Sequence, residues 1–333
     1  MSIRLFKFDD GILEKILKIM QTVEIITLSF CSKACKRLAK VNLRPCSFLH
    51  IDQIRRGDCL RVNVIIRGED LSMELGNDYG RPREARDLVL TISRLSIFVD
   101  PMVTIRMPRY KRSSAWIAHL MDITGLKAVQ YLTISNNKLT MQSIYDCVSN
   151  YRISTLVLRN TVTAQTLSKI GLFTNASGIS LGNATPLTVK RTEKILARNF
   201  ESVNFVQDLK IDNILASSTR RLHINLYRQE SRMSEKDLNR FVKHWQRGAC
   251  PYLTHLEISF SPTIMIDGHI FLRRVEIGAI LRGVNYRMET RMEREEAVDN
   301  YFIRNKEHFE ARVFLGEGRR AEPKFELIID RWR

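Results

Sequence analysis

Residues 7–40 read KFDDGILEKILKIMQTVEIITLSFCSKACKRLAK, and this stretch decides the N-terminal fold. Apolar residues recur in it with the spacing of one broad helical stripe, and Glu14 and Lys18 lie on the opposite side of that helix. The apolar positions are Ile12, Leu13, Ile16, Leu17 and Met20. The pattern predicts a helix of about three turns. Asp9 or Asp10 can cap it, because a carboxylate accepts hydrogen bonds from the amides of the first turn.

A second apolar surface follows within the same stretch, at Val23, Ile25, Ile26, Leu28 and Phe30. A core built from about forty residues is too small to fold securely without help. Two interpretations remain open. Either the segment is a helical hairpin that packs on its own domain, or a partner protein covers part of its apolar surface.

The segment resembles an F-box, the module that docks a protein onto the Skp-type adaptor of a cullin ubiquitin ligase. The run LSFCSK at 28–33 carries the likeness, after the acidic Glu24. The family usually has proline where this chain has Asp9 and Thr22, so the rigid entry to the first helix and the fixed turn before the second are missing. The resemblance implies adaptor contacts through Leu5, Phe8, Ile12, Leu13, Ile16, Leu17, Met20, Ile25, Leu28 and Cys31.

Composition bounds the class of protein. The chain has 333 residues, of which 44% are hydrophobic, so it can bury a sizeable core and form more than one structural unit. There is no long apolar signal segment, and no run of about eighteen apolar residues that would span a membrane. Six cysteines are too sparse for a disulfide scaffold. These features predict an intracellular protein, cytoplasmic or nuclear, with no membrane partner.

The 53 basic and 36 acidic residues leave a net charge of +17. A basic surface attracts nucleic acid phosphates and acidic proteins alike. The chain has no aromatic-interleaved basic motif, zinc finger or RNP signature that would indicate nucleic-acid binding. A solvated basic face is therefore the favoured interpretation, and nucleic acid is not an expected partner.

Cys31, Cys35, Cys46 and His50 have a spacing that superficially offers four zinc ligands. Structural zinc sites usually place a tight turn between paired cysteines, whereas Cys31 and Cys35 lie in an expected helix. We therefore predict no metal and no cofactor. Motifs for a nucleophile elbow, a phosphate-binding loop and paired zinc-binding histidines are also missing, and no nucleophile can be assigned to His244. The chain is not expected to be an enzyme.

Short β-branched runs within residues 48–110 predict strands: HIDQI, LRVNVIIR, LSMEL and LVLTISRLSIFV. A helix is expected from about Ser113, with Trp116, Ile117, Leu120, Met121 and Ile123 on its buried face.

A repeat follows, in which an apolar-x-apolar strand pattern precedes an asparagine. Its members are Leu132-x-Ile134-x-Asn136, Leu156-x-Leu158-x-Asn160 and Ile179-x-Leu181-x-Asn183, and Val203-x-Phe205, Leu222-x-Ile224 and Leu256-x-Ile258 continue the series. The pattern resembles a leucine-rich repeat. The alternative is a plain α/β layer with evenly spaced strands.

Residues 233–260 combine a capped helix with a strand. Ser234 is the expected N-cap, with Asp237 three residues on, and Gly248 ends the helix. The buried stripe is Leu238, Phe241, Val242 and Trp245. The segment resembles the type 2 F-box-associated domain, abundant in nematode F-box proteins, through its DLN-x-F-x-K-x-W-x-x-G core. The runs ILRGVNY at 280–286, YFIR, ARVFL and FELIIDRW resemble the short strands that finish those proteins.

Together these features predict an α+β fold, with a small helical F-box followed by a β-rich connector and an α/β, leucine-rich-repeat-like region. The expected boundaries are 4–44 for the F-box, 45–112 for the connector, 113–199 for the repeat-like region, 200–268 for the type 2 F-box-associated domain and 269–333 for the C-terminal strands.

The resemblance implies a non-catalytic substrate-recognition subunit of a cullin-based, SCF-type ubiquitin ligase. Its partners would be a Skp-type adaptor, through it a cullin, and an unknown protein target. Target contacts are expected on the outer face of the helix that begins after Ser234, at Lys236, Asn239, Arg240, Lys243 and Arg247. The alternative is a binding scaffold outside any ligase, for an acidic protein or RNA.

Overall fold

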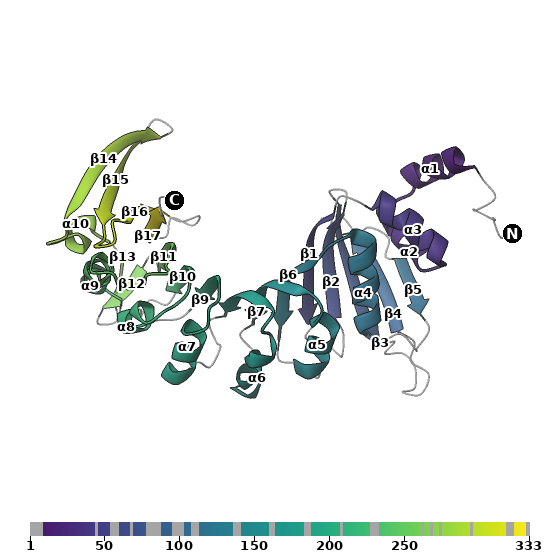
Figure 1. The fold of residues 1–333 in the computed structure, drawn as a ribbon, viewed down its shortest axis with the longest axis horizontal. Helices are drawn as coiled ribbons and strands as arrows, with labels where there is room; N and C mark the ends of the chain where they lie inside the picture. The colour runs from purple at the N-terminus through teal and green to yellow at the C-terminus, as the bar shows by residue number, and fades with distance from the viewer. Residues whose placement is uncertain are drawn as a thin grey trace. The chain divides into compact units, whose positions relative to one another are not determined.

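A computed structural model describes residues 9–43, 46–53, 60–66, 69–77, 88–94, 103–107, 113–135, 141–159, 164–182, 188–206, 209–226, 233–261, 263–266, 269–272, 275–293, 296–317 and 323–330. The chain divides into two compact units. The first is Met1–Leu156 with Gln165–Ala176, and the second is Val157–Ala164 with Ser177–Arg333. Figure 1 labels the helices and strands of each unit.

Three helices begin the first unit: α1 (Asp10–Ile19), α2 (Thr22–Ser29) and α3 (Lys33–Asn42). The predicted cap of α1 is confirmed, because Asp9 Oδ1 accepts a hydrogen bond of 2.9 Å from the Ile12 amide. The prediction that one helix contains both Cys31 and Cys35 is wrong, because α3 begins after Cys31. Cys31 lies in the turn between α2 and α3, where Ser32 caps α3 by accepting a bond of 3.1 Å from the Cys35 amide.

Five antiparallel strands follow, each paired with the next: β1 (Cys46–Gln53), β2 (Leu60–Ile66), β3 (Glu69–Asn77), β4 (Leu88–Arg94) and β5 (Val103–Met107). The first four coincide with the β-branched runs of the sequence, and β5 is an additional strand. On β2, the buried side chains alternate at Leu60, Val62 and Val64. This alternation is expected of a strand with one face turned to the core.

Helix α4 (Ser113–Thr124) then leads to β6 (Ala128–Ile134), which pairs in parallel with β1. The predicted buried face of α4 is confirmed for Trp116, Ile117, Leu120, Met121 and Ile123. Helix α5 (Met141–Val148), strand β7 (Arg152–Leu158), helix α6 (Ala164–Ser168) and the short helix η3 (Ile170–Leu172) come next along the chain.

The second unit contains parallel strands β8 (Ala176–Leu181), β9 (Ser202–Phe205), β10 (Arg221–Leu226) and β11 (His255–Phe260). They are connected by α7 (Val189–Leu196), α8 (Ile211–Leu215) and α9 (Glu235–Gln246). The apolar positions that continue the sequence repeat are buried on β9, β10 and β11. Leucine-rich-repeat geometry itself stays a prediction, and Asn136, Asn160 and Asn183 lie outside the described residues.

The C-terminal part of the second unit contains a separate hairpin and four more strands of the large sheet. Strands β12 (Thr263–Ile266) and β13 (His269–Leu272) form the hairpin, a sheet of its own, and α10 (Ile277–Ile280) follows. Strands β14 (Tyr286–Glu293), β15 (Glu296–Arg304), β16 (Glu310–Glu317) and β17 (Pro323–Asp330) form an antiparallel meander. β17 also pairs with β11.

One predicted strand in this region is wrong. The run at 280–286 forms the end of α10 and a turn, and β14 begins at its last residue. Gly283 has φ 66°, a left-handed conformation that interrupts an extended strand and that glycine adopts without strain.

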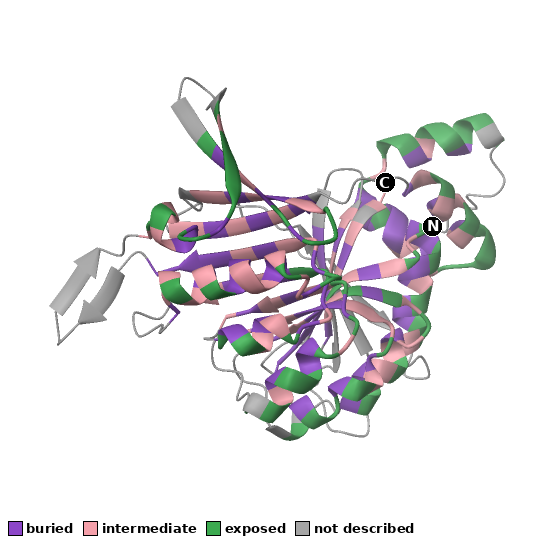
Figure 2. Ribbon diagram, turned by 60° about the vertical axis from the view of Figure 1, so that its left-hand side comes forward, coloured by how far each residue is buried: buried purple, intermediate pink, exposed green. Residues whose placement is uncertain are grey.

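Helix α9 forms as its sequence predicts. Ser234 and Asp237 make a capping box, in which the Ser234 amide donates to Asp237 Oδ2 at 2.9 Å. The stripe Leu238, Phe241, Val242 and Trp245 is buried. Gly248, with φ 93°, follows the helix in the left-handed conformation typical of a helix end. Figure 2 colours the ribbon by burial and shows buried and exposed residues alternating along the helices.

Trp245→Ala should lower the free energy of unfolding by about 3–5 kcal/mol, because it removes a large, fully buried side chain and leaves a cavity. Urea unfolding of the full chain measures this change. Lys236→Ala on the exposed side of α9 is the matched control and should cost less than about 0.5 kcal/mol. Similar losses in the two variants would contradict the burial of this stripe.

Candidate functional site

Helix α1 has two apolar faces. Leu13 and Leu17 are buried, so they hold α1 on the first unit. Ile12 and Ile19 are 42% and 83% exposed, and Ile16 is half-buried between them. These three isoleucines lie at i, i+4 and i+7, the spacing of one helix face. We call them the isoleucine stripe.

The far side of α1 is polar. Glu14 and Lys18 form an i, i+4 ion pair of 2.7 Å there, and the ammonium of Lys18 lowers the pKa of the Glu14 carboxyl. An exposed helix with a polar side needs no apolar stripe on its other exposed side. The isoleucine stripe is therefore a feature that folding of the described residues leaves unexplained.

Helix α2 begins without the proline that its family pattern would supply. The Gln21 amide instead donates a hydrogen bond of 2.7 Å to Glu24 Oε2, which satisfies one of the unpaired amides at the helix start. Thr22 is buried at this position. A side-chain bond thus fixes the turn between α1 and α2.

The structure separates the described adaptor-binding residues of the prediction into three groups by burial. Leu13, Leu17 and Ile25 are core residues, whereas Ile12 and Cys31 are exposed, and Ile16, Met20 and Leu28 are half-buried. Leu5 and Phe8 lie outside the described residues. Sequence periodicity did not identify Ile19 or Val41, which are 83% and 77% exposed. Their exposure depends on how the helices pack, so the sequence alone could not reveal it.

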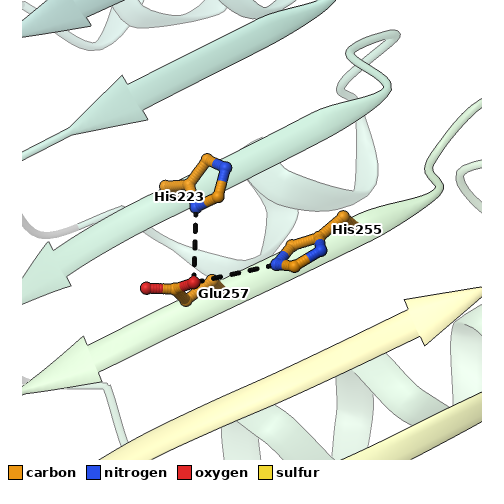
Figure 3. Close-up of side chains that lie close together, drawn as sticks. All are labelled: His223, His255 and Glu257. Carbon is orange, nitrogen blue, oxygen red and sulfur yellow. Dashed lines mark ion pairs between the residues drawn. The ribbon is translucent and has the colours of Figure 1, made fainter. Parts of the chain in front are cut away.

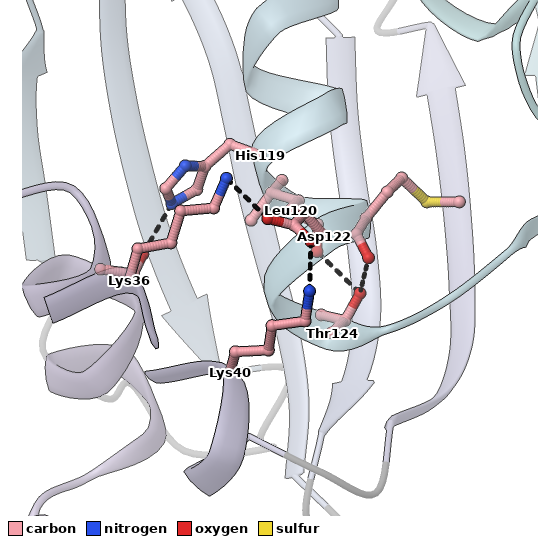
Figure 4. Close-up of polar contacts among 8 residues, drawn as sticks. Lys36, Lys40, His119, Leu120, Asp122 and Thr124 are labelled. Atoms are coloured by element: carbon pink, nitrogen blue, oxygen red, sulfur yellow. Dashed lines mark hydrogen bonds and ion pairs between the residues drawn. The ribbon is translucent and has the colours of Figure 1, made fainter. Parts of the chain in front are cut away.

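Helices α2 and α3 are joined to α4 by a set of polar and aromatic contacts, which we call the α3–α4 joint. Lys36 and Lys40 on α3 reach Asp122 on α4, with Nζ to carboxylate oxygen distances of 2.8 and 2.6 Å (Figure 4). Within α4, the Thr124 hydroxyl donates to the Leu120 carbonyl oxygen at 2.7 Å.

The aromatic part of the joint lies beside these ion pairs. The Phe30 ring stacks on His119 with centroids 4.3 Å apart and meets Trp116 edge-on at 4.7 Å. Ser29 Oγ lies 2.8 Å from His119 Nε2. Because both charge pairing and ring packing link the same helices, the three-helix segment has a fixed attachment to α4.

The zinc spacing noted in the sequence does not assemble. Cys31 is exposed in a turn, whereas Cys35 is buried in α3. Among the described residues, Cys31, Cys35, Cys46 and His50 do not form a group of donors within reach of one another.

The outer face of α9 carries the residues predicted to contact a target. Lys236 and Arg247 are exposed and Lys243 is half-buried. Arg240 forms an ion pair of 2.7 Å with Asp212 on α8. Asn239 also has a structural part, because its amide group donates to the carbonyl oxygens of Ile280 and Arg282 at 2.5 and 3.0 Å, and its contact with a target stays a prediction. Asn239 therefore holds the turn after α10 against α9.

Two family models match the chain. The F-box domain model covers residues 5–44, which contain α1–α3, and the F-box associated model, of type 2, covers residues 191–258, from α7 into β11. The second match begins and ends before the expected boundaries of 200–268. The comparisons with curated proteins and with solved structures gave no match.

These matches bear out the resemblance to an F-box protein with a type 2 F-box-associated domain. Proteins with these domains are typically non-catalytic substrate adaptors of SCF-type ligases, and an F-box implies binding to a Skp-type adaptor. Within the described part of the chain, no helix combines the length and apolar character needed to cross a membrane.

Asp122→Asn should lower the free energy of unfolding at pH 7 by about 0.5–1 kcal/mol, a small effect because the ion pairs are partly exposed. Hydrogen bonds from Lys36 and Lys40 lower the pKa of Asp122 from 3.8 to about 2. A carboxyl with a lowered folded-state pKa stabilises the fold above its unfolded pKa, and this contribution is lost as the pH falls toward about 2.

Urea unfolding at a series of pH values tests this linkage. The difference in unfolding free energy between wild type and Asp122→Asn should shrink as the pH falls below about 4. Asp146→Asn on α5 is the control for loss of an exposed helical carboxylate. A difference that stays constant with pH would contradict the ion-paired state of Asp122.

Proposed function

We propose that this chain, which carries an F-box domain followed by an F-box-associated domain, is the substrate-recognition subunit of a cullin-based, SCF-type ubiquitin ligase. It binds a Skp-type adaptor through the F-box and a protein target through the later part of the chain. The adaptor in turn binds a cullin. The proposal rests chiefly on one observation: the F-box presents an exposed isoleucine stripe on α1.

The isoleucine stripe supports an adaptor interface by its chemistry. A buried aliphatic side chain contributes about 1.5–3 kcal/mol relative to an exposed one, so covering Ile12, Ile16 and Ile19 is a substantial driving force for association. The core residues Leu13, Leu17 and Ile25 have a different part in this proposal. They hold α1 and α2 in the orientation that presents the stripe, rather than contacting the adaptor themselves.

Catalysis in such a ligase requires no reactive group on the receptor. Tethering a target near a charged ubiquitin-conjugating enzyme raises its local concentration and turns a rare encounter into an intramolecular one. The gain depends on geometry, because a linker that cannot span the two sites gives no effective concentration. The α3–α4 joint supports this function, since it attaches the F-box to α4 through two ion pairs and an aromatic stack.

We place target recognition on the second unit, around its strands and the outer face of α9. Lys236, Lys243 and Arg247 give this face a positive charge, and Arg240 is balanced by Asp212. Charge of one sign steers a partner of the opposite sign and favours it over others. The proposed target surface is therefore complementary to an acidic protein segment.

Ile12→Glu and Ile19→Glu should each weaken binding of a Skp-type adaptor about 10-fold to 100-fold, because each buries a charge in place of an aliphatic side chain. The double variant should lose detectable binding. Titration calorimetry with purified adaptor measures the affinity. Circular dichroism should show an intact fold, since Ile12 is 42% and Ile19 83% exposed and neither belongs to the buried core.

Lys18→Gln is the control on the polar side of α1 and removes one positive charge without touching the stripe. It should bind the adaptor with the affinity of wild type. Adaptor binding that survives the folded Ile12→Glu, Ile19→Glu double variant would refute this interface. Failure of the wild-type chain to bind any Skp-type adaptor would favour the alternative, a scaffold outside the ligase.

The double reversal Lys243→Glu, Arg247→Glu should reduce capture of an acidic target without unfolding the second unit, because both groups lie at the outer side of α9. Proximity labelling in cells compares the proteins near the wild-type and variant chains. The matched control is Lys190→Glu, Lys194→Glu, which makes the same charge change on α7. Identical profiles for wild type and the α9 variant would exclude this face from target recognition.

A further inference from the structure

Two histidines and a glutamate come together on β10 and β11 of the second unit. His223 and Glu257 are direct partners in the parallel register, and His255 lies two residues before Glu257 on the same face of its strand. Their donor atoms all lie within 4.8 Å of one another. Figure 3 shows the three side chains turned toward one another on one face of the two strands. We call these residues the His–Glu cluster.

This face is the one turned away from the buried core of the sheet. Leu222, Ile224 and Leu256, which alternate with the cluster residues, are buried, whereas the cluster residues are half-buried. The side chains of His223, His255 and Glu257 remain 31%, 23% and 24% exposed. The donors are thus sheltered but still within reach of a small ion from solvent.

The third strand, β17, supplies a second carboxylate. Glu326 is the register partner of Glu257, and its Oε1 lies 3.3 Å from His255 Nε2. Although Glu257 Oε2 lies 3.7 Å from the same nitrogen, His255 Nε2 is shielded from water and has no hydrogen-bond partner among the described residues. This nitrogen therefore lies between two carboxylate oxygens, and both distances are longer than those of a strong charge-assisted hydrogen bond.

We propose that the His–Glu cluster binds a divalent transition metal ion, with Zn²⁺ as the best match. Imidazole nitrogen and carboxylate oxygen are both zinc ligands, and two histidines with one glutamate are a known zinc donor set. Ligands about 2.0–2.1 Å from zinc in a tetrahedron are about 3.4 Å apart. The distances from Glu257 Oε2 to His223 Nδ1 and His255 Nε2 are 3.6 and 3.7 Å, so the ligands need little closure.

Three ligands leave a fourth position on the ion, which Glu326 or a water can occupy. Coordination through Glu326 would extend the metal link from β10 and β11 to β17, and so fix the C-terminal strand to the F-box-associated region. The inference does not depend on the proposed ligase function, because it rests on the geometry of the second unit.

Lys324 is the natural competitor at this site. Its Nζ lies 3.0 Å from Glu257 Oε2 and 3.2 Å from Glu326 Oε2. The imidazoles of His223 and His255 and the ammonium of Lys324 all contact Glu257 and hold the pKa of its carboxyl well below the ordinary value. A divalent ion must share these carboxylates with the ammonium or displace it. Removal of Lys324 should therefore strengthen metal binding.

The test is calorimetric titration of the full chain with Zn²⁺, in a Cys31→Ser background that removes an exposed thiol. Wild type should bind one ion at the cluster. His255→Gln should weaken binding more than about 100-fold, beyond the loss typical of outer-shell changes. Lys324→Met should tighten it about tenfold, because one positive charge near the ion is removed. His244→Gln on α9 is the control and should bind like wild type.

Circular dichroism of the metal-free proteins checks that each variant is folded, and His223→Gln replaces His255→Gln if the latter is not. The absorption spectrum of bound Co²⁺ identifies the ligands, because imidazole and carboxylate ligands lack the charge-transfer band of thiolates. Equal Zn²⁺ affinity in wild type and a folded cluster variant, absence of Zn²⁺ binding in wild type, or a thiolate spectrum would each overturn the proposal.

Discussion

The fold depends on the need to cover one face of every strand in its parallel series. On β10, the buried residues Leu222, Ile224 and Leu226 alternate with half-buried polar ones, and the stripe of α9 buries Leu238, Phe241, Val242 and Trp245 against the core. Each strand therefore requires a helix before the next strand can pair in parallel. The same alternation places a row of polar side chains on the opposite face, where His223 and Glu257 meet.

The F-box shows how a segment with a small core can be held in place. Its internal core includes Leu17, Ile25 and Ala39, but Phe30, Lys36 and Lys40 are directed at α4. The packing on α4 agrees with the first interpretation left open by the sequence, whereas a partner-covered surface stays a proposal. One surface of the three helices packs on the chain's own α4, and the isoleucine stripe, which we propose as the adaptor surface, lies on another.

Local patterns could be predicted from the sequence, whereas contacts between distant segments could not. Helix α9, with its Ser234 cap and Trp245 stripe, was predictable because every determinant lies within one short stretch. The partner of Lys36 and Lys40 is Asp122, and nothing in the local sequence identifies that carboxylate. Ile12 and Leu13 are adjacent and equally apolar, so periodicity gave no basis for assigning one to the surface and the other to the core.

The His–Glu cluster is another set of contacts between distant segments that the sequence does not reveal. Zinc motifs are recognised in sequence when their ligands occur in closely spaced pairs, as the spacing of Cys31, Cys35, Cys46 and His50 superficially suggests. In this chain the donors that converge come from β10, β11 and β17, and a shift of one residue in either register would turn one of them to the core face. The register that buries Leu256 and Phe325 therefore also aligns His223, Glu257 and Glu326, so the polar site is a geometric consequence of the apolar core.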